Sequence, residues 1–255
     1  MARKILPELV AIIDGKLKNN GSAQLAIQNK DARKLMLFAA QACVGESEQG
    51  GNNRGKFVEL IQKTSDGNAS REAWCMAFVQ SMIAYAETKT GVTSTIYNSE
   101  HCLTTWRKSK AADRVQKIPA PGAVIIWQHG KSENGHTGFV TEYLDKKMTT
   151  VEGNTGANMR EGDGVYSKTR STKTDGDMTV VGFIIPFPLK ENVITKPTLP
   201  VEPSIPGGAL RRGKTRTRAP CPGTSECLGP VRSPPERNRR LRTRLPWSRM
   251  VLTDI

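Results

Sequence analysis

The segment EAWCMAFVQSMIAYAE, residues 72–87, carries one reactive side chain, Cys75, within an otherwise apolar run. A cysteine attacks as a thiolate, so its ordinary pKa of about 8.5 must be lowered by a helix N-terminus or a charged histidine. Cys75 follows the polar stretch SDGNASREAW, which places it at the start of a predicted helix. Backbone N–H groups there can lower the thiol pKa and receive the oxyanion of an amide under attack. The alternative is a small buried side chain, a common role of free cysteine.

A nucleophilic cysteine requires a base, and His136 is the histidine best placed to supply one. It begins the predicted strand GHTGFVTEYL, where flanking glycines leave its ring approachable, whereas His129 falls in a turn and His101 in an irregular segment. The base in turn requires an acceptor that fixes its tautomer. Glu152 and Asn154 lie two residues apart in VEGNT, so on an extended strand they share a face and either one can orient His136.

Apolar periodicity predicts the elements that must hold these side chains. Four helices are expected in the first half, at residues 5–18, 31–44, 56–63 and 74–87. The following segment, 88–118, is less regular, and from Pro119 short apolar or alternating runs are separated by turn residues. Five strands are expected there, at residues 123–128, 136–144, 148–154, 164–170 and 179–187. Helices followed by strands indicate an α+β fold with an antiparallel sheet of about five strands.

The composition divides the chain into four predicted regions. Residues 1–30 are interpreted as an N-terminal helical extension and residues 31–188 as the catalytic domain. Ten of the fifteen prolines lie beyond that domain, between residues 196 and 246. We therefore expect an extended Pro-rich linker at 189–210 and a disordered Arg/Pro-rich tail at 211–255.

Positive charge is concentrated in the last fifth of the chain. The formal net charge is +14, and residues 201–255 carry 12 Lys and Arg against 4 Asp and Glu. A segment of this charge attracts polyanions such as nucleic acid, acidic lipid or the anionic polymers of a cell envelope. No lysine follows Lys214 and arginine takes over, which fits either a basic arm or a stretch read in a different frame.

Cysteine usage and the N-terminus bear on where the protein acts. The five cysteines include no CxxC pair and no zinc-site spacing, so Cys43, Cys102, Cys221 and Cys227 are expected to be free thiols. The N-terminal apolar run LVAII is too short for a secretory signal, and no run approaches the roughly 20 apolar residues that span a bilayer. We therefore expect synthesis in the cytoplasm without a signal peptide, and no transmembrane segment.

Six pieces of the sequence, taken in order, resemble the CHAP domains, which are cysteine- and histidine-dependent amidohydrolases/peptidases of the papain-like superfamily. The pieces are GESEQGGNNRG, AWCMAFV, PGAVIIW, GHTGFV, VEGNT and VVGFIIPF, and they span about residues 32–187. The resemblance implies a papain-like (CHAP/NlpC-P60-type) fold, with Cys75 as nucleophile, His136 as base, and Glu152 and Asn154 as the acidic and amide positions. CHAP domains of bacteriophage endolysins and bacterial autolysins cut peptidoglycan, which implies that activity here.

Four further residues are candidates for substrate contact. Glu48 and Asn53, in the loop GESEQGGNNRG, either bind substrate or tie that loop to the rim of the site. Trp74 and Trp127 either contact substrate or pack beside the nucleophile and the cleft. Some CHAP relatives bind calcium through clustered aspartates near the nucleophile. No such cluster is evident upstream of Cys75, so we expect no metal and no cofactor.

The expected function is that of a phage-lysin-type peptidoglycan hydrolase, a monomer made in the host cytoplasm that acts on the cell wall after release. Its expected partners are bacterial peptidoglycan and, through the basic tail, anionic envelope polymers, with no obligate nucleic acid. One alternative is a non-enzymatic basic envelope- or nucleic-acid-binding protein with an inactive papain-like body. Another is a secreted antibacterial effector with the same chemistry. These residues leave open whether the bond cut is that of an amidase or an endopeptidase.

Overall fold

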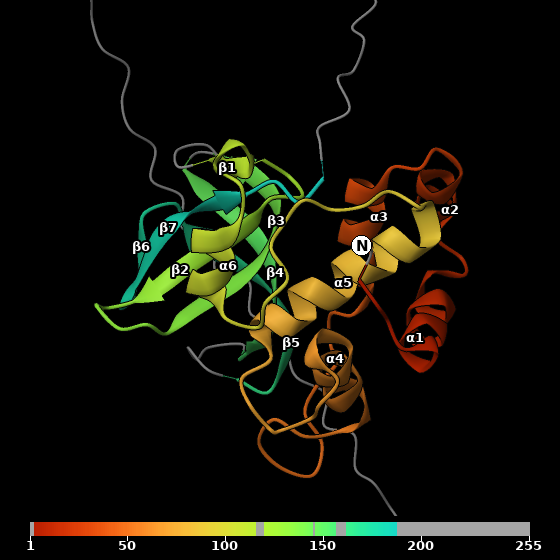
Figure 1. Ribbon diagram of the computed structural model, residues 1–255, viewed down its shortest axis with the longest axis horizontal. Helices are drawn as coiled ribbons and strands as arrows, with labels where there is room; N and C mark the ends of the chain where they lie inside the picture. The colour runs from red at the N-terminus through yellow and green to blue at the C-terminus, as the bar shows by residue number, and fades with distance from the viewer. Residues whose placement is uncertain (1–2, 116–119, 145, 157–161, 188–255) are drawn as a thin grey trace, which may run out of the picture. The chain divides into compact units, whose positions relative to one another are not determined.

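A buried helix, α5 (Cys75–Thr90), lies at the centre of the fold in the computed structural model (Figure 1). Few of its positions are polar, so it requires packing partners on nearly all sides. Helices α3 (Ala32–Ala42) and α4 (Lys56–Asp66) supply part of that cover. Strands β3 (Gly135–Leu144) and β4 (Lys147–Thr155) supply the rest, so that α5 lies between the other helices and a sheet.

The structure describes residues 3–115, 120–144, 146–156 and 162–187. All of them belong to one unit, Met1–Thr195. The predicted linker at 189–210 and the predicted tail at 211–255 lie outside the described residues, as do Cys221 and Cys227.

Six α-helices and one short 3₁₀ helix occur in the described part of the chain. Besides α3, α4 and α5 they are α1 (Pro7–Leu17), α2 (Gly21–Gln28), α6 (Cys102–Lys108) and the 3₁₀ helix η1 (Ala111–Asp113). The four predicted helices are confirmed as α1, α3, α4 and α5, whereas α2 and α6 were not predicted. Both are short, and α2 depends on a cap in which the Asn20 side chain accepts a hydrogen bond from the Ala23 N–H. None of the helices described is long and apolar enough to cross a membrane.

Seven strands in the described residues form one antiparallel sheet. Besides β3 and β4 they are β1 (Arg114–Val115), β2 (Val124–His129), β5 (Gly164–Ser171), β6 (Thr174–Asp175) and β7 (Met178–Ile184). Their order across the sheet is β1-β7-β2-β3-β4-β5, and β6 pairs with β7. The five predicted strands are confirmed as β2, β3, β4, β5 and β7, and the fold class is α+β as expected.

Both faces of the sheet are covered at β2, which explains its continuous apolar sequence. Val124 and Ile126 belong to the main core, which the sheet shares with the helices. Ile125 and Trp127 belong to a second apolar cluster, because alternate side chains of a strand point to opposite faces.

The N-terminal helices contribute to the main core. Leu9 and Ile13 of α1 and Ala23 of α2 are fully buried within it. Both helices contact α3, so residues 7–28 pack against the region predicted as the catalytic domain.

Candidate active site

Cys75 is the first residue of α5, as predicted, and only 6 % of it is exposed. The first N–H groups of a helix have no partner within that helix, and they form the positive end of its dipole. The Met76 N–H in this turn interacts with the Cys75 sulfur. The start of α5 therefore stabilises negative charge on the sulfur.

His136 is buried on β3, where its cross-strand neighbour on β2 is Trp127. The imidazole and indole rings stack with their centroids 5.7 Å apart and an angle of 23° between their planes. This stack fixes the plane of the imidazole, and the ring lines the same cavity as Cys75.

Glu152 on β4 is fully buried and pairs with His136, with 3.0 Å between Glu152 Oε2 and His136 Nε2. Gly138 makes room for this pair, because a Cβ atom at that position would lie 2.6 Å from Glu152 Cγ. The prediction left Glu152 and Asn154 as alternative partners of His136, and the structure pairs the ring with Glu152. Since Nε2 is engaged by the carboxylate, Nδ1 is the ring nitrogen left to exchange a proton with Cys75.

Arg170 on β5 holds the other side of the Glu152 carboxylate and was not predicted. Its Nε donates to Oε1 at 2.8 Å and its Nη2 donates to Oε2 at 2.6 Å, a bidentate pair buried in the fold. A third bond runs from Nη1 to Asp175 at 2.8 Å. The guanidinium also lies 5.6 Å from the centre of the Trp127 ring, whose own stack supports His136. Arg170 therefore positions both the carboxylate and the stack.

The charges of these groups follow from their contacts. The pKa of Cys75 is held well below its usual value, and the hydrogen bond with Cys102 is the largest cause. Burial would raise this pKa, whereas the hydrogen bond and the charge attraction from His136 lower it further. Burial lowers the pKa of His136, but its bonds with Cys75 and Glu152 outweigh burial and raise it to about 9. Burial likewise raises the pKa of Glu152, and Arg170 and His136 together lower it to about 2. At neutral pH the site therefore holds a thiolate, an imidazolium and a carboxylate.

Asn154 approaches the same cavity through an irregularity in β4. The pairing of β4 with β5 shifts register between Glu152 and Thr155, and Asn154 has a φ of 53°. The register shift makes this end of β4 irregular, so the expectation that Glu152 and Asn154 share one face of an extended strand stays a prediction. Asn154 nevertheless lines the cavity together with Cys75 and His136.

The cavity beside the nucleophile measures about 330 Å³. It is lined by Glu72, Ala73, Cys75, Glu100, His101, Cys102, His129, Glu133, Asn134, Gly135, His136 and Asn154. The reactive sulfur, the base and several polar side chains thus face one space. Such an arrangement can carry out nucleophilic attack on a carbonyl with general acid–base help from the histidine.

The family model of the CHAP domain matches residues 65–154, which contain Cys75, His136, Glu152 and Asn154. This part of the chain is a CHAP domain. No curated protein and no solved structure matches the chain. The resemblance noted in the sequence is therefore confirmed at the level of the family, and the match supports a hydrolase of the amidase or peptidase type. Arg170 lies beyond the matched residues.

Glu48 and Asn53 fasten the loop before α4 to the segment that precedes the nucleophile of the CHAP domain. Glu48 accepts a hydrogen bond from Trp74 Nε1 at 3.0 Å, and Asn53 donates to the backbone carbonyl of Arg71 at 3.0 Å. Of the two alternatives given for these residues, the contacts correspond to tying the loop to the rim. Neither residue lines the cavity, and a role in substrate binding stays a prediction.

Trp74 and Trp127 are completely buried. Trp74 meets the ring of Phe78 edge to face in α5, and Trp127 lies between His136 and Arg170. These positions correspond to packing beside the nucleophile and beneath the base, the second of the two alternatives given for these residues. Neither ring is part of the cavity lining.

Three carboxylates come together at one end of the CHAP cavity. One oxygen from each of Asp66, Glu72 and Glu100 lies within 4.8 Å of the others. Burial, followed by repulsion from Asp66 and Glu72, raises the pKa of Glu100 to about 6. The expectation of no metal considered only the residues upstream of Cys75. Asp66 and Glu72 lie there, but the third carboxylate, Glu100, follows Cys75 in the sequence. The absence of a metal therefore stays a prediction.

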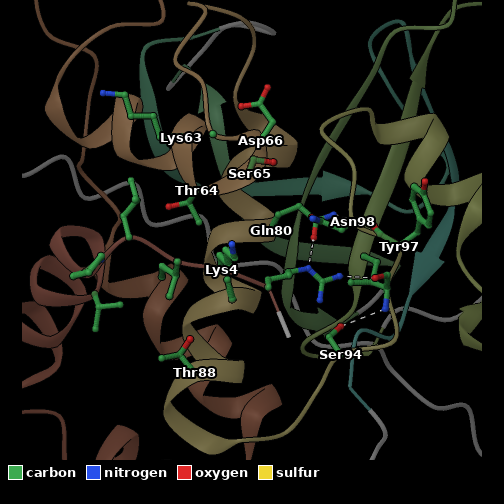
Figure 2. A pocket seen from close by; sticks show the side chains of 18 of the residues that line it. Lys4, Lys63, Thr64, Ser65, Asp66, Gln80, Thr88, Ser94, Tyr97 and Asn98 are labelled. Atoms are coloured by element: carbon green, nitrogen blue, oxygen red, sulfur yellow. Dashed lines mark hydrogen bonds between the residues drawn. The ribbon is translucent and has the colours of Figure 1, made fainter. Parts of the chain in front are cut away.

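A larger cavity, of about 1420 Å³, lies away from the nucleophile (Figure 2). It is bounded by the N-terminal segment, α1, the end of α4 and one side of α5. Arg3 crosses it, with its Nε bonded to Gln80 at 2.8 Å and its Nη1 bonded to Glu87 at 2.8 Å. The lining contains no cysteine and no histidine, so the chemistry of the CHAP domain belongs to the smaller cavity.

Proposed function

We propose that the chain hydrolyses an amide bond in the peptide part of bacterial peptidoglycan, with Cys75 as its nucleophile. The observation that carries this proposal is the 3.0 Å pair of His136 with Glu152 in the cavity that also holds Cys75. The CHAP match supports the reaction class of an amidase or peptidase. Peptidoglycan is the substrate that the family suggests.

The first chemical step begins from the thiolate–imidazolium pair. The Cys75 sulfur attacks the carbonyl carbon of the bound amide, and the carbonyl oxygen takes the negative charge. The N–H groups at the start of α5 stabilise that oxyanion. His136 then donates its proton to the leaving amine, and an acyl group remains on Cys75.

The second step releases the acyl group with water. His136 is now neutral and takes a proton from a water molecule, which attacks the thioester carbon. Glu152 keeps Nε2 protonated throughout, so Nδ1 accepts and donates in turn. The step ends with a free carboxylic acid and the thiolate–imidazolium pair restored.

The setting we propose is that of a phage lysin, made in the host cytoplasm and released to the wall. An amidase would cut the bond between the sugar and L-alanine, whereas an endopeptidase would cut within the peptide. Mass spectrometry of fragments released from purified peptidoglycan distinguishes the two. A free muramic acid end identifies an amidase, and a cut inside the peptide identifies an endopeptidase.

The decisive test compares two cysteine variants in a cell-wall clearing assay. Cys75→Ala is expected to abolish the fall in turbidity while binding to sedimented wall is unchanged, because only the nucleophile is lost. The matched control is Cys43→Ala. Cys43 is also buried and free, but burial raises the pKa of its thiol to about 12, so it remains neutral and should not contribute.

Two results would count against the proposal. Clearing retained by Cys75→Ala would remove this residue from the mechanism. A wild-type chain that binds wall or nucleic acid in a salt-dependent way but never clears the suspension would instead indicate a non-enzymatic binding protein.

A further inference from the structure

A second thiol lies against the nucleophile; it helps to stabilise the Cys75 thiolate, but it forms no bond and transfers no proton in the reaction just described. Cys102 is the first residue of α6, is 5 % exposed and lines the same cavity as Cys75. Its Sγ is 3.8 Å from the Cys75 Sγ. Both sulfurs are free thiols, and the remaining free thiol of the described residues, Cys43, lies outside this cavity.

We propose that Cys102 is a resolving cysteine, which captures oxidised Cys75 as a reversible Cys75–Cys102 disulfide and so protects the nucleophile from irreversible oxidation. A disulfide has an S–S length of about 2.05 Å, so the two sulfurs must approach by roughly 1.8 Å. Rotation about the Cα–Cβ bonds is the movement that the proposal requires for this approach. The inference does not depend on which bond the enzyme cuts.

The backbone around the pair brings the second thiol close. Gly135 immediately precedes His136, and a Cβ atom at that glycine would lie 3.0 Å from the Cβ of Cys102. The missing side chain lets the start of α6 approach β3. The same glycine therefore places Cys102 beside both the base and the nucleophile.

The chemistry requires a hydroperoxide as oxidant and balances in two steps. The Cys75 thiolate attacks one oxygen of hydrogen peroxide, the O–O bond breaks, and the departing hydroxide leaves as water after taking a proton from His136. Cys75 is then a sulfenic acid. The Cys102 sulfur, after losing its proton, attacks the Cys75 sulfur, and the sulfenic hydroxyl leaves with that proton as water. Two thiols and one peroxide thus give one disulfide and two waters.

Electrostatic interactions keep the Cys102 thiol protonated until Cys75 is oxidised. The bond with the Cys75 thiolate is the largest factor raising the pKa of Cys102 well above its usual value, followed by burial and by the charge of Cys75. Oxidation of Cys75 to a neutral sulfenic acid removes the charge behind two of these three causes. Cys102 then loses its proton more readily, with neutral His136 in the same cavity as the available base.

The test treats the full chain with hydrogen peroxide and blocks the remaining thiols with iodoacetamide before tryptic digestion. Trypsin places Cys75 in the peptide 72–89 and Cys102 in the peptide 90–107, so a cross-linked pair identifies the disulfide. We expect wild type and Cys43→Ala to form this pair, to lose clearing activity and to recover it with dithiothreitol. Cys102→Ala is expected to accumulate Cys75 sulfinic acid and to show no recovery.

The inference is overturned if wild-type Cys75 reaches the sulfinic acid as fast as in Cys102→Ala with no 72–89/90–107 cross-link. The cross-link in the wild-type chain is the primary readout, so an unstable Cys102→Ala variant does not prevent the test. Because the cross-link is read without any substrate, it also separates this inference from the proposed function. Wall clearing by Cys75→Ala would contradict the proposed function, but it would not alter the evidence for the disulfide, which is read in the wild-type chain.

Discussion

A chain of alternating charges runs through the active site from Cys75 to Asp175. The Cys75 thiolate faces the His136 imidazolium, which lies 3.0 Å from Glu152; Glu152 in turn accepts from Arg170 at 2.6 Å, and Arg170 donates to Asp175 at 2.8 Å. A buried charge without a partner is costly, so each member of this chain offsets the burial of its neighbours. Arg170 is the member that keeps Glu152 ionised and therefore able to orient His136.

This charge distribution predicts the pH dependence of the nucleophile. The thiolate is the reactive form, and the lowered pKa of Cys75 preserves it well below the ordinary thiol pKa of about 8.5. Alkylation of Cys75 by iodoacetamide should therefore remain fast at pH values below the ordinary thiol pKa, measured on the tryptic peptide 72–89. Wall clearing should fall as pH rises through about 9, because His136, whose pKa is about 9, then loses the proton that the leaving amine requires.

His136→Ala provides the control for this prediction. Without the imidazolium, the midpoint of Cys75 alkylation should move to higher pH, while Cys75 remains present and accessible. A wild-type midpoint near pH 8.5, unchanged in the variant, would show that the thiolate–imidazolium pair does not form.

The sequence indicated the central reactive groups because each has a strong local signal. Cys75 stands between a polar stretch and an apolar run, and His136 stands among glycines at the start of a strand. Cys102 and Arg170 have no comparable signal. They reach the site through α6, which is seven residues long, and through the pairing of β4 with β5, whose register includes a bulge that periodicity does not reveal.

At the scale of elements, the contact between α5 and β4 sets the position of Glu152, the carboxylate that orients His136, relative to the helix that holds Cys75. Gly153 lies between Glu152 and Asn154 on β4 and faces the first turn of α5. A Cβ atom there would lie 2.7 Å from Phe78 Cβ and 2.9 Å from the Trp74 ring. A strand carrying any side chain at this position must move away from the helix that holds Cys75.

Gly153→Ala is therefore expected to lower the free energy of unfolding by about 1–3 kcal/mol, the usual cost of overpacking a core. It should also reduce the initial rate of wall clearing under conditions where the variant remains folded. Urea denaturation and clearing assays on the same preparation measure the two effects.

Gly15→Ala serves as the matched substitution. Gly15 lies in α1 with no atom within 4 Å of the position its Cβ would occupy, so alanine should stabilise the helix by about 0.5–1 kcal/mol and leave clearing unchanged. Equal behaviour of the two variants would mean that the α5–β4 contact does not control the site.

The elements themselves follow from the sequence where the apolar pattern is long. The strands β2, β3, β4, β5 and β7 have six to ten residues each, enough to display their alternation or their buried run. Helix α2 was missed because Gly21 and Ser22 begin it, and α6 because its seven residues complete only two turns. The bulge at Gly153–Asn154 was missed because a local backbone irregularity leaves the surrounding pattern intact.

At the scale of the whole molecule, the core and the charge are assigned to different parts of the chain. The main core and the second apolar cluster are made of residues between Ile5 and Phe187. Residues 201–255 carry a net charge of +8, and residues 1–200 carry the remaining +6. Folding and catalysis should therefore depend on the first part, and attraction to polyanions chiefly on the second.

A chain that ends at Phe187 tests this division. Since the described core contains no residue beyond Phe187, the shortened chain should unfold at the same urea concentration as the full chain and clear wall suspensions at the same rate at high salt. At low salt it should bind anionic cell walls more weakly, and its binding should decline less steeply as salt is added, because screening acts on fewer charges.

A full-length variant with the arginines of residues 211–244 changed to glutamine separates charge from length, and it should behave like the shortened chain. Equal wall affinity and equal salt dependence for all three proteins would show that the tail has no role in targeting, as expected if it were a stretch read in a different frame.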